Sequence, residues 1–236
     1  QIKSNDPLLL VVNSIIQIHF MRKNYNFAEK LVSKLDGKKV FDSNSFTVSE
    51  LASYFFLKGK IDMVYDRRNL AYIEFNKSLQ YLPLSCKKDR RLVLAHLIPV
   101  SLSFGIVPTD ELLNAYNLSD LYSDFATAVS TGNLQFFNRA LNSHQSFLIS
   151  IGVWEMIIYS KRMVYRRILE MVKIQTNYPI VNIEAFRLAL CLSGEECSFE
   201  DTILIISNLI YDKLVMANVA FQQAMIVFRK SGEFNL

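Results

Sequence analysis

Glycine and proline are scarce in this sequence, with seven glycines and five prolines among 236 residues, while apolar residues make up 51%. Because these two residues are the main breakers of regular structure, their scarcity favours long helices over many short strands. The apolar content suffices for one large domain or two small ones. The sequence therefore predicts a mainly α-helical protein.

Helix start and stop signals divide the first half of the chain. Residues 47–50 (TVSE) have the spacing of a capping box and should open a helix that the segment 58–60 (KGK) stops. A second periodic stretch, 66–82, ends before Pro83. Its apolar stripe is expected to contain Leu70, Ile73, Leu79 and Leu82.

Further helices are expected at 87–105, bent or interrupted near Pro99, and at 134–148 and 153–173. Another helix should start at residues 108–111 (PTDE), with its two acids in the positive first turn. In residues 131–133 (TGN), the glycine fits the residue after a helix and the asparagine fits an N-cap. The first three quarters thus predict stacked antiparallel helices with short turns, as in degenerate helical repeats.

The last quarter has a different pattern. A short helix at 183–192 precedes a second capping box at 198–201 (SFED), which should open a helix at 200–211. Two short apolar runs, 214–221 and 224–228, then resemble a β-hairpin. This order predicts a winged helix, so we expect a helical repeat-like part at 1–180 and a winged-helix subdomain at 181–236.

No pattern of catalytic or metal-binding residues is present. The three histidines, His19, His96 and His144, are far apart and lack the spacing of metal ligands. The glycines form no phosphate-binding loop, and no G-x-S-x-G motif occurs. We therefore expect no catalytic residue, cofactor or metal, and we interpret His96 as a buried, hydrogen-bonded side chain.

The three cysteines are Cys86, Cys191 and Cys197. Their odd number and irregular spacing fit neither a disulfide framework nor a zinc site, and are typical of a reducing compartment. A reactive pair formed by Cys191 and Cys197 is not expected.

The longest uncharged run, residues 92–109, is interrupted by Pro99, Gly105 and Pro108. This favours a buried helix pair over a membrane span, and we expect no membrane insertion.

The first basic cluster is residues 87–91 (KKDRR), which open a helix. Cations at a helix N-terminus are unfavourable with the helix dipole, so this cluster suggests something beyond local helix stability. Two interpretations stay open, a solvated turn and a nucleic-acid phosphate contact. The candidate residues are Lys87, Lys88, Arg90 and Arg91.

The second basic cluster lies on the helix expected at 153–173. At 100° per residue, Arg162, Arg166 and Lys173 share a face beside the apolar stripe. That stripe is expected to hold Trp154, Ile158, Tyr165, Ile168 and Val172. Lys161 lies within the stripe and must pair or extend to solvent. The face is either a flank with local ion pairs or a surface for nucleic acid or a partner.

The second helix of a winged helix usually reads DNA, but here it opens with Glu200 and Asp201 and contains no Lys or Arg. Such a helix would repel phosphate, so we expect this unit to dock proteins, while Arg229 and Lys230 could still contact a phosphate backbone. The expected partner-binding residues are Glu200, Asp201, Asn208, Tyr211, Met216 and Asn218.

Five segments resemble one known family when they are taken together and in order. They are 88–100 (KDRRLVLAHLIPV), 105–113 (GIVPTDELL), 128–134 (AVSTGNL), 165–169 (YRRIL) and 207–211 (SNLIY). The sequence is similar to the PCI-domain family, and most similar to its branch in the second transcription-export complex (TREX-two). A sister branch, associated with the signalosome, shares most of these motifs.

The resemblance implies a non-catalytic scaffold subunit that links transcription to mRNA export in the nucleus, at nuclear pores. It implies two partners, a large GANP-type scaffold subunit and a small acidic protein of the DSS/Sem type. Binding of RNA or DNA without sequence specificity is a further expectation. The alternative is a signalosome-associated subunit that acts in protein assembly.

Two segments depart from the family pattern. Residues 212–219 (DKLVMANV) lack the glycine that usually precedes the first wing strand, and residues 232–236 (GEFNL) replace a proline-rich ending. We therefore expect a divergent member whose turn into the wing has its own shape.

Overall fold

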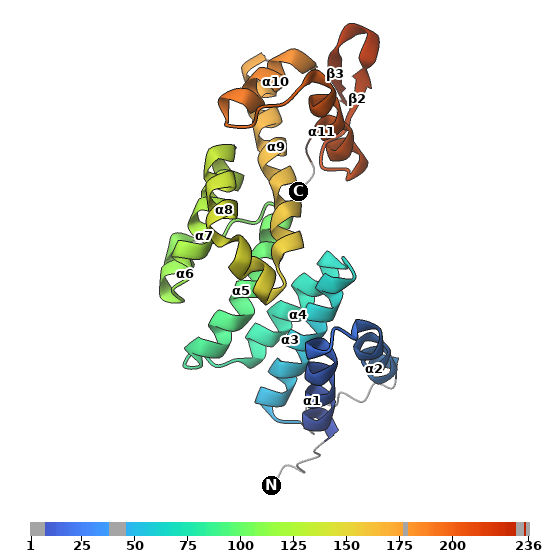
Figure 1. Ribbon diagram of the computed structural model, residues 1–236, viewed down its shortest axis with the longest axis vertical. Coiled ribbons are helices and arrows are strands. Elements are labelled where there is room, and N and C mark those ends of the chain that lie inside the picture. Colours follow the sequence, from blue (N-terminus) through green and yellow to red (C-terminus); the bar gives the residue numbers. More distant parts are fainter. Residues whose placement is uncertain (1–7, 38–45, 177–178, 230–233, 235–236) are drawn as a thin grey trace. The chain divides into compact units, whose positions relative to one another are not determined.

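The computed structural model describes residues 8–37, 46–176, 179–229 and 234, and Figure 1 shows the order of its elements. The chain divides into two compact units, residues 1–100 and 101–236. This division falls within one helix, and the boundary expected at 180–181 lies inside the second unit. Each unit is described separately below.

The first unit is built from helices that pack as antiparallel neighbours. They are α1 (Leu8–Met21), α2 (Tyr25–Gly37), α3 (Val48–Val64), α4 (Arg68–Tyr81) and α5 (Lys87–Ser103), of which α5 extends across the division. Helix α3 packs against α1, α2 and α4. The core of this unit includes Ile16, Tyr54, Ile61 and Phe75, each with at most 1% of its surface exposed.

Helix α3 begins at the predicted capping box, in which Thr47 and Glu50 each bond to the other's backbone N–H. The prediction that residues 58–60 stop this helix is wrong, because α3 continues to Val64. Gly59 is buried, and a Cβ there would lie 2.7 Å from the ring of Phe75. This glycine therefore permits close helix packing instead of ending the helix.

The apolar stripe expected on α4 is also wrong. Leu70 and Ile73 are each 46% exposed, whereas Ala71, Phe75 and Ser78 are buried. Apart from Phe75, the buried residues of α4 are small or polar. The Ser78 hydroxyl donates a 2.8 Å hydrogen bond to the Ala52 carbonyl of α3.

Helix α5 continues through Pro99 to Ser103, so the expected interruption is absent. Residues 93–103 are buried, and the chain leaves the helix at 104–109, giving one long helix where a pair was expected. His96 is 3% exposed, and its Nδ1 lies 2.9 Å from the Leu92 carbonyl, which confirms the expected buried, hydrogen-bonded histidine.

The second unit begins with four helices joined by short turns. They are α6 (Asp110–Ala115), α7 (Ser119–Thr131), α8 (Leu134–Ile151) and α9 (Trp154–Thr176). Gly132 ends α7 in the left-handed conformation, with φ of 76°, and the Asn133 side chain caps α8, both as predicted.

A small winged helix follows α9. Its elements are β1 (Ile180–Asn182), α10 (Ile183–Leu192), α11 (Phe199–Tyr211), β2 (Ala217–Ala220), the 3-10 turn η1 (Phe221–Gln223) and β3 (Met225–Phe228). The strands form an antiparallel sheet in the order β1-β3-β2, in which Val181 and Val219 both pair with Ile226. The sequence predicted both helices and the hairpin but missed β1, which is three residues long.

Ser193, just after α10, connects the winged helix to the turn between α7 and α8. Its hydroxyl donates to the Gly132 carbonyl and accepts from the Leu134 N–H at 3.1 Å. Its carbonyl accepts from the Gln135 N–H at 3.0 Å. Three hydrogen bonds at one residue therefore fix where α10 ends within the second unit.

Helical repeats followed by a winged helix are the predicted architecture, and the structure confirms it. Within the described residues, no helix combines the length and hydrophobicity needed to cross a membrane.

Candidate interaction surfaces

The exposed face of α11 is the first candidate surface. Asp201, Leu204, Asn208 and Tyr211 are spaced three or four residues apart, so they share one face of the helix. Leu204 is 60% exposed and Tyr211 is 85% exposed, whereas Ile206 and Leu209, which face the core, are fully buried. This surface, which we call the α11 face, combines apolar side chains with an acidic end.

The acids at the start of α11 differ in their contacts. Asp201 closes the second capping box by accepting hydrogen bonds from the Ser198 hydroxyl at 2.7 Å and the Ser198 N–H at 3.1 Å. Both hydrogen bonds lower the pKa of Asp201, and the bond from the Ser198 side chain has the larger effect. Glu200 is exposed beside it. Asp201 therefore supports the helix itself, and Glu200 is the acid presented to solvent.

The remaining predicted partner-binding residues lie next to the hairpin. Asn218 is exposed on β2, and Met216, just before that strand, is half-buried. Arg229 connects them, since its N–H donates to the Met216 carbonyl at 3.0 Å and its guanidinium lies 3.5 Å from Asn218 Oδ1. Lys230, the last predicted phosphate contact, lies outside the described residues.

The first basic cluster contains both structural and exposed cations. Arg90 Nη1 donates to the carbonyls of Leu79 and Leu82, at 2.9 and 2.7 Å, and so binds the C-terminal end of α4. Lys87, Lys88 and Arg91 lie on the first turns of α5 and keep solvent-accessible side chains. Arg90 therefore has a local structural role, and the other three present the positive charge. Their predicted contact with nucleic acid stays a prediction.

The second basic cluster makes internal ion pairs along α9. Lys161 pairs with Glu195 at 2.7 Å, which confirms that it must pair or extend to solvent. Arg162 forms an ion pair with Asp212, just after α11. These contacts support the interpretation as a flank with local ion pairs.

The apolar stripe expected on α9 is partly wrong, because Ile168 is buried as expected but Ile158 is not. Ile158 is 38% exposed, while Ile157, Val164 and Leu169 are fully buried. Helix α9 packs against α7, α8, α10 and α11 at once, so its buried face is wider than one stripe and is rotated from the expected one. The flank that carries Arg162 and Arg166 packs against the winged helix, whose α11 contacts α9 (Figure 1).

Arg166 differs from the other two arginines of α9. Its Nε donates to the Leu214 carbonyl at 3.3 Å and its guanidinium lies 5.6 Å from the Phe234 ring. Burial lowers its pKa, against the opposite influence of Glu170. Within the described part of the chain it has no ion pair, whereas neighbouring Arg167 pairs with Glu170 at 2.8 Å.

Arg166 and Arg167 line a groove of about 360 Å³ together with Ser130, Met163 and Phe234. Lys173, the last predicted residue of this cluster, lies nearby with its ammonium 5.0 Å from the Phe228 ring and 5.7 Å from the Phe234 ring. A cation over an aromatic ring is attracted by the negative face of the ring.

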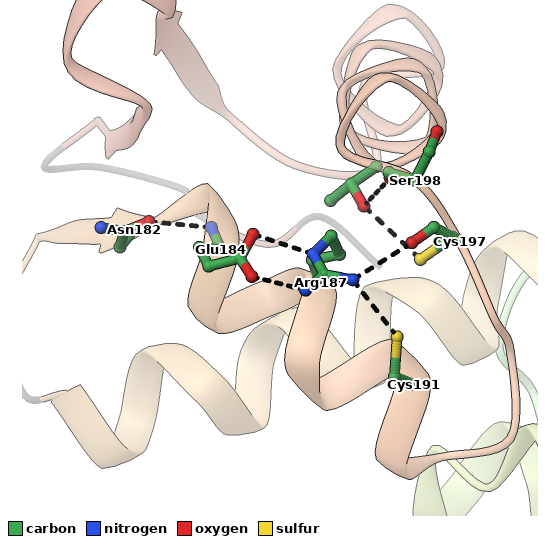
Figure 2. A network of polar contacts seen from close by, with 7 residues as sticks. Asn182, Glu184, Arg187, Cys191, Cys197 and Ser198 are labelled. Carbon is green, nitrogen blue, oxygen red and sulfur yellow. Dashed lines mark hydrogen bonds and ion pairs between the residues drawn. The ribbon is translucent and has the colours of Figure 1, made fainter.

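A polar network that the sequence did not reveal lies between α10 and α11, and Figure 2 shows it. Arg187 forms two hydrogen bonds to Glu184, at 2.6 and 2.8 Å, and its Nη1 also lies 3.8 Å from Cys191 Sγ and 3.4 Å from the Cys197 carbonyl. Glu184, Arg187 and Cys191 are three and four residues apart on α10, a spacing that could have predicted their contacts. Nothing in the sequence indicated that Cys197 would join them.

The described residues contain no cluster of three or more His, Cys, Asp and Glu side chains that could hold a metal ion.

Comparison with known proteins tests the family resemblance. The chain is 26% identical over 218 residues to a PCI domain-containing protein 2 homolog of Dictyostelium discoideum, covering 92% of this chain and 50% of that protein. It is likewise 26% identical over 228 residues to PCI domain-containing protein 2 of Danio rerio, covering 96% and 56%. The predicted resemblance to the PCI-domain family is confirmed.

A relative of lower identity carries a different name. The chain is 22% identical over 247 aligned residues to a Protein CSN12 homolog of Gibberella zeae, covering 96% of this chain and 54% of that protein. No family model matches the sequence. The chain spans about half the length of the curated relatives it matches.

Proposed function

We propose that this protein is a non-catalytic scaffold subunit of a nuclear mRNA-export complex coupled to transcription, located at nuclear pores. It would bind a large GANP-type scaffold subunit and a small acidic DSS/Sem-type protein, and contribute positive charge to the binding of RNA or DNA. The observation that carries the docking role is the α11 face, where Leu204 and Tyr211 are largely exposed on a helix without basic residues.

The first unit offers a second surface for the scaffold subunit. Helix α1 exposes Leu10, Val11, Ile18 and Met21, with 57, 51, 49 and 85% of their surfaces accessible. Val11, Ile18 and Met21 lie on one side of the helix, with the exposed Ser14 between the first two. Exposed apolar faces of this kind are typical of protein–protein contacts.

The docking role is tested by co-purification of the full-length protein with a GANP-type scaffold. A variant carrying Leu204→Glu and Tyr211→Ala should lose most of the bound scaffold or of the small acidic protein. A matched control, Leu188→Glu with Phe147→Ala, makes similar changes at other exposed positions and should bind normally. Equal binding by both variants would exclude the α11 face from docking.

The nucleic-acid role is tested on the assembled complex by measuring affinity against salt. Lys87→Glu with Lys88→Glu should weaken binding and reduce the salt slope by about 0.9 for each phosphate that is no longer neutralised. Lys30→Glu with Lys34→Glu on α2 makes the same change in net charge at other exposed lysines. If both pairs weaken binding equally, the effect is one of overall charge and the α5 site is excluded.

The second candidate function is a signalosome-associated subunit that binds only proteins. The likeness to the Protein CSN12 homolog favours it. Identification of co-purifying proteins by mass spectrometry separates the two, since the scaffold subunit differs between the complexes.

A further inference from the structure

The segment between α10 and α11 brings two cysteines to the same place. Cys191 lies in the last turn of α10, and Cys197 lies immediately before Ser198, the N-cap of α11. Arg187 Nη1 contacts the Cys191 thiol at 3.8 Å and the Cys197 carbonyl at 3.4 Å, so a single guanidinium holds both residues (Figure 2).

The two thiol groups also interact with each other. Burial is the main cause that raises the pKa of Cys197, the hydrogen bond with Thr202 lowers it, and the neighbouring Cys191 thiol raises it further. Cys197 Sγ additionally lies 3.5 Å from Thr202 Oγ1 in the first turn of α11. Both cysteines are partly exposed, so small oxidants can reach them.

We propose that Cys191 and Cys197 form a dithiol modification site that a peroxide oxidises to an intramolecular disulfide. The Cys191 thiolate attacks one oxygen of hydrogen peroxide, the O–O bond breaks, and the products are a sulfenic acid and hydroxide. The Cys197 thiol then attacks the sulfenic sulfur, forming the S–S bond and releasing the hydroxyl as water. Altogether two thiols and one peroxide give one disulfide and two waters.

The network favours this pairing over the other combinations of cysteines. A disulfide requires the two Cα atoms to lie within roughly 7 Å. Arg187 Nη1 contacts the Cys191 thiol and the Cys197 carbonyl, so these two residues are neighbours around one guanidinium. Cys86, the third cysteine, lies between α4 and α5 in the first unit and outside this network. The disulfide would connect the end of α10 directly to the start of α11, the helix that carries the α11 face.

The test uses the reduced full chain treated with increasing hydrogen peroxide and then with N-ethylmaleimide. Intact-mass analysis should show the loss of two alkylatable thiols and of two hydrogens, and peptide mapping should find Cys86 still alkylated. Dithiothreitol should restore all three thiols. Oxidation of each cysteine alone to sulfinic acid, or disulfide-linked dimers, would overturn the proposal.

Three single variants make the assignment specific. Cys86→Ser should form the disulfide as the unmodified chain does, whereas Cys191→Ser and Cys197→Ser should not. Disulfide formation should also be faster in the folded chain than in urea, because the fold holds the two thiols together. Equal or slower formation in the folded chain would show that the structure does not promote the pairing. This proposal does not depend on the proposed scaffold function.

Discussion

Arg162 on α9 forms an ion pair with Asp212, the C-cap residue of α11, and the Tyr159 hydroxyl donates to the same carboxylate at 3.2 Å. The Asp212 side chain is 13% exposed, so this carboxylate is largely withdrawn from water. The pair therefore connects the long helix of the second unit to the end of the helix that bears the α11 face.

Replacing Asp212 with Asn should destabilise this contact by about 1–3 kcal/mol, the range for removing a charged partner from a partly buried hydrogen bond. Hydrogen exchange should become faster in α11 and in the middle of α9. Asp124→Asn serves as a control, because its pair with Arg139 is 37 and 61% exposed and should contribute less than about 1 kcal/mol. Equal effects of the two variants would contradict a special role for Asp212.

Gly132 and Gly152 allow a second comparison of a variant with a matched control. Both end helices at positive φ, 76° and 80°, where any other residue costs roughly 1–2 kcal/mol. A Cβ on Gly132 would additionally lie 2.7 Å from Met171 Cε, whereas a Cβ on Gly152 would meet no described atom within 4 Å. Gly132→Ala should therefore lower the midpoint of urea unfolding more than Gly152→Ala.

Local sequence signals predicted helices and caps well, because their causes lie within a few residues. The capping boxes at Thr47 and Ser198, the left-handed Gly132 and the Asn133 cap all formed as expected. Lys213 makes the turn after α11 at φ of 59° without a glycine, which agrees with the expectation of a turn with its own shape.

Contacts between distant segments were not predictable in the same way. The sequence placed Arg162 and Arg166 on one helix face, but it contained no sign that Asp212 and the Leu214 carbonyl would lie opposite them. Gly59 failed as a stop signal for the same reason, since its role depends on Phe75 in another helix. Candidate charged surfaces from sequence thus need a structure to separate internal partners from exposed groups.

Lys60 gives a pH-dependent prediction. Burial lowers its pKa from the usual 10.5, and its ammonium lies 5.0 Å from the Phe20 ring and 5.7 Å from the Phe56 ring. Since the unfolded chain binds this proton more tightly, the contribution of Lys60 to stability rises as pH increases through its folded pKa towards 10.5. Lys60→Met should raise stability at pH 7, and this gain should shrink in alkaline solution.

Lys58 is the control for that prediction. Burial lowers its pKa, but its ion pairs with Asp36 and Glu74, at 2.8 and 3.3 Å, outweigh burial, and the net pKa is raised. Its stabilising contribution is therefore present at neutral pH and is lost only as pH rises through the folded pKa. Lys58→Met should destabilise the chain at pH 7, opposite in sign to Lys60→Met, as measured by chemical denaturation at several pH values.

Variants of Arg166 and Arg162 distinguish an arginine that binds nucleic acid from one that stabilises the fold. Arg162→Gln should lower stability because it leaves Asp212 without its cation, whereas Arg166→Gln removes no ion pair among the described residues and should cost less. If Arg166 contacts a phosphate, its neutralisation should reduce the salt slope of nucleic-acid binding by about 0.9. Arg162→Gln should leave that slope unchanged, because Asp212 already neutralises this cation. A slope change for Arg162→Gln and none for Arg166→Gln would reverse the assignment.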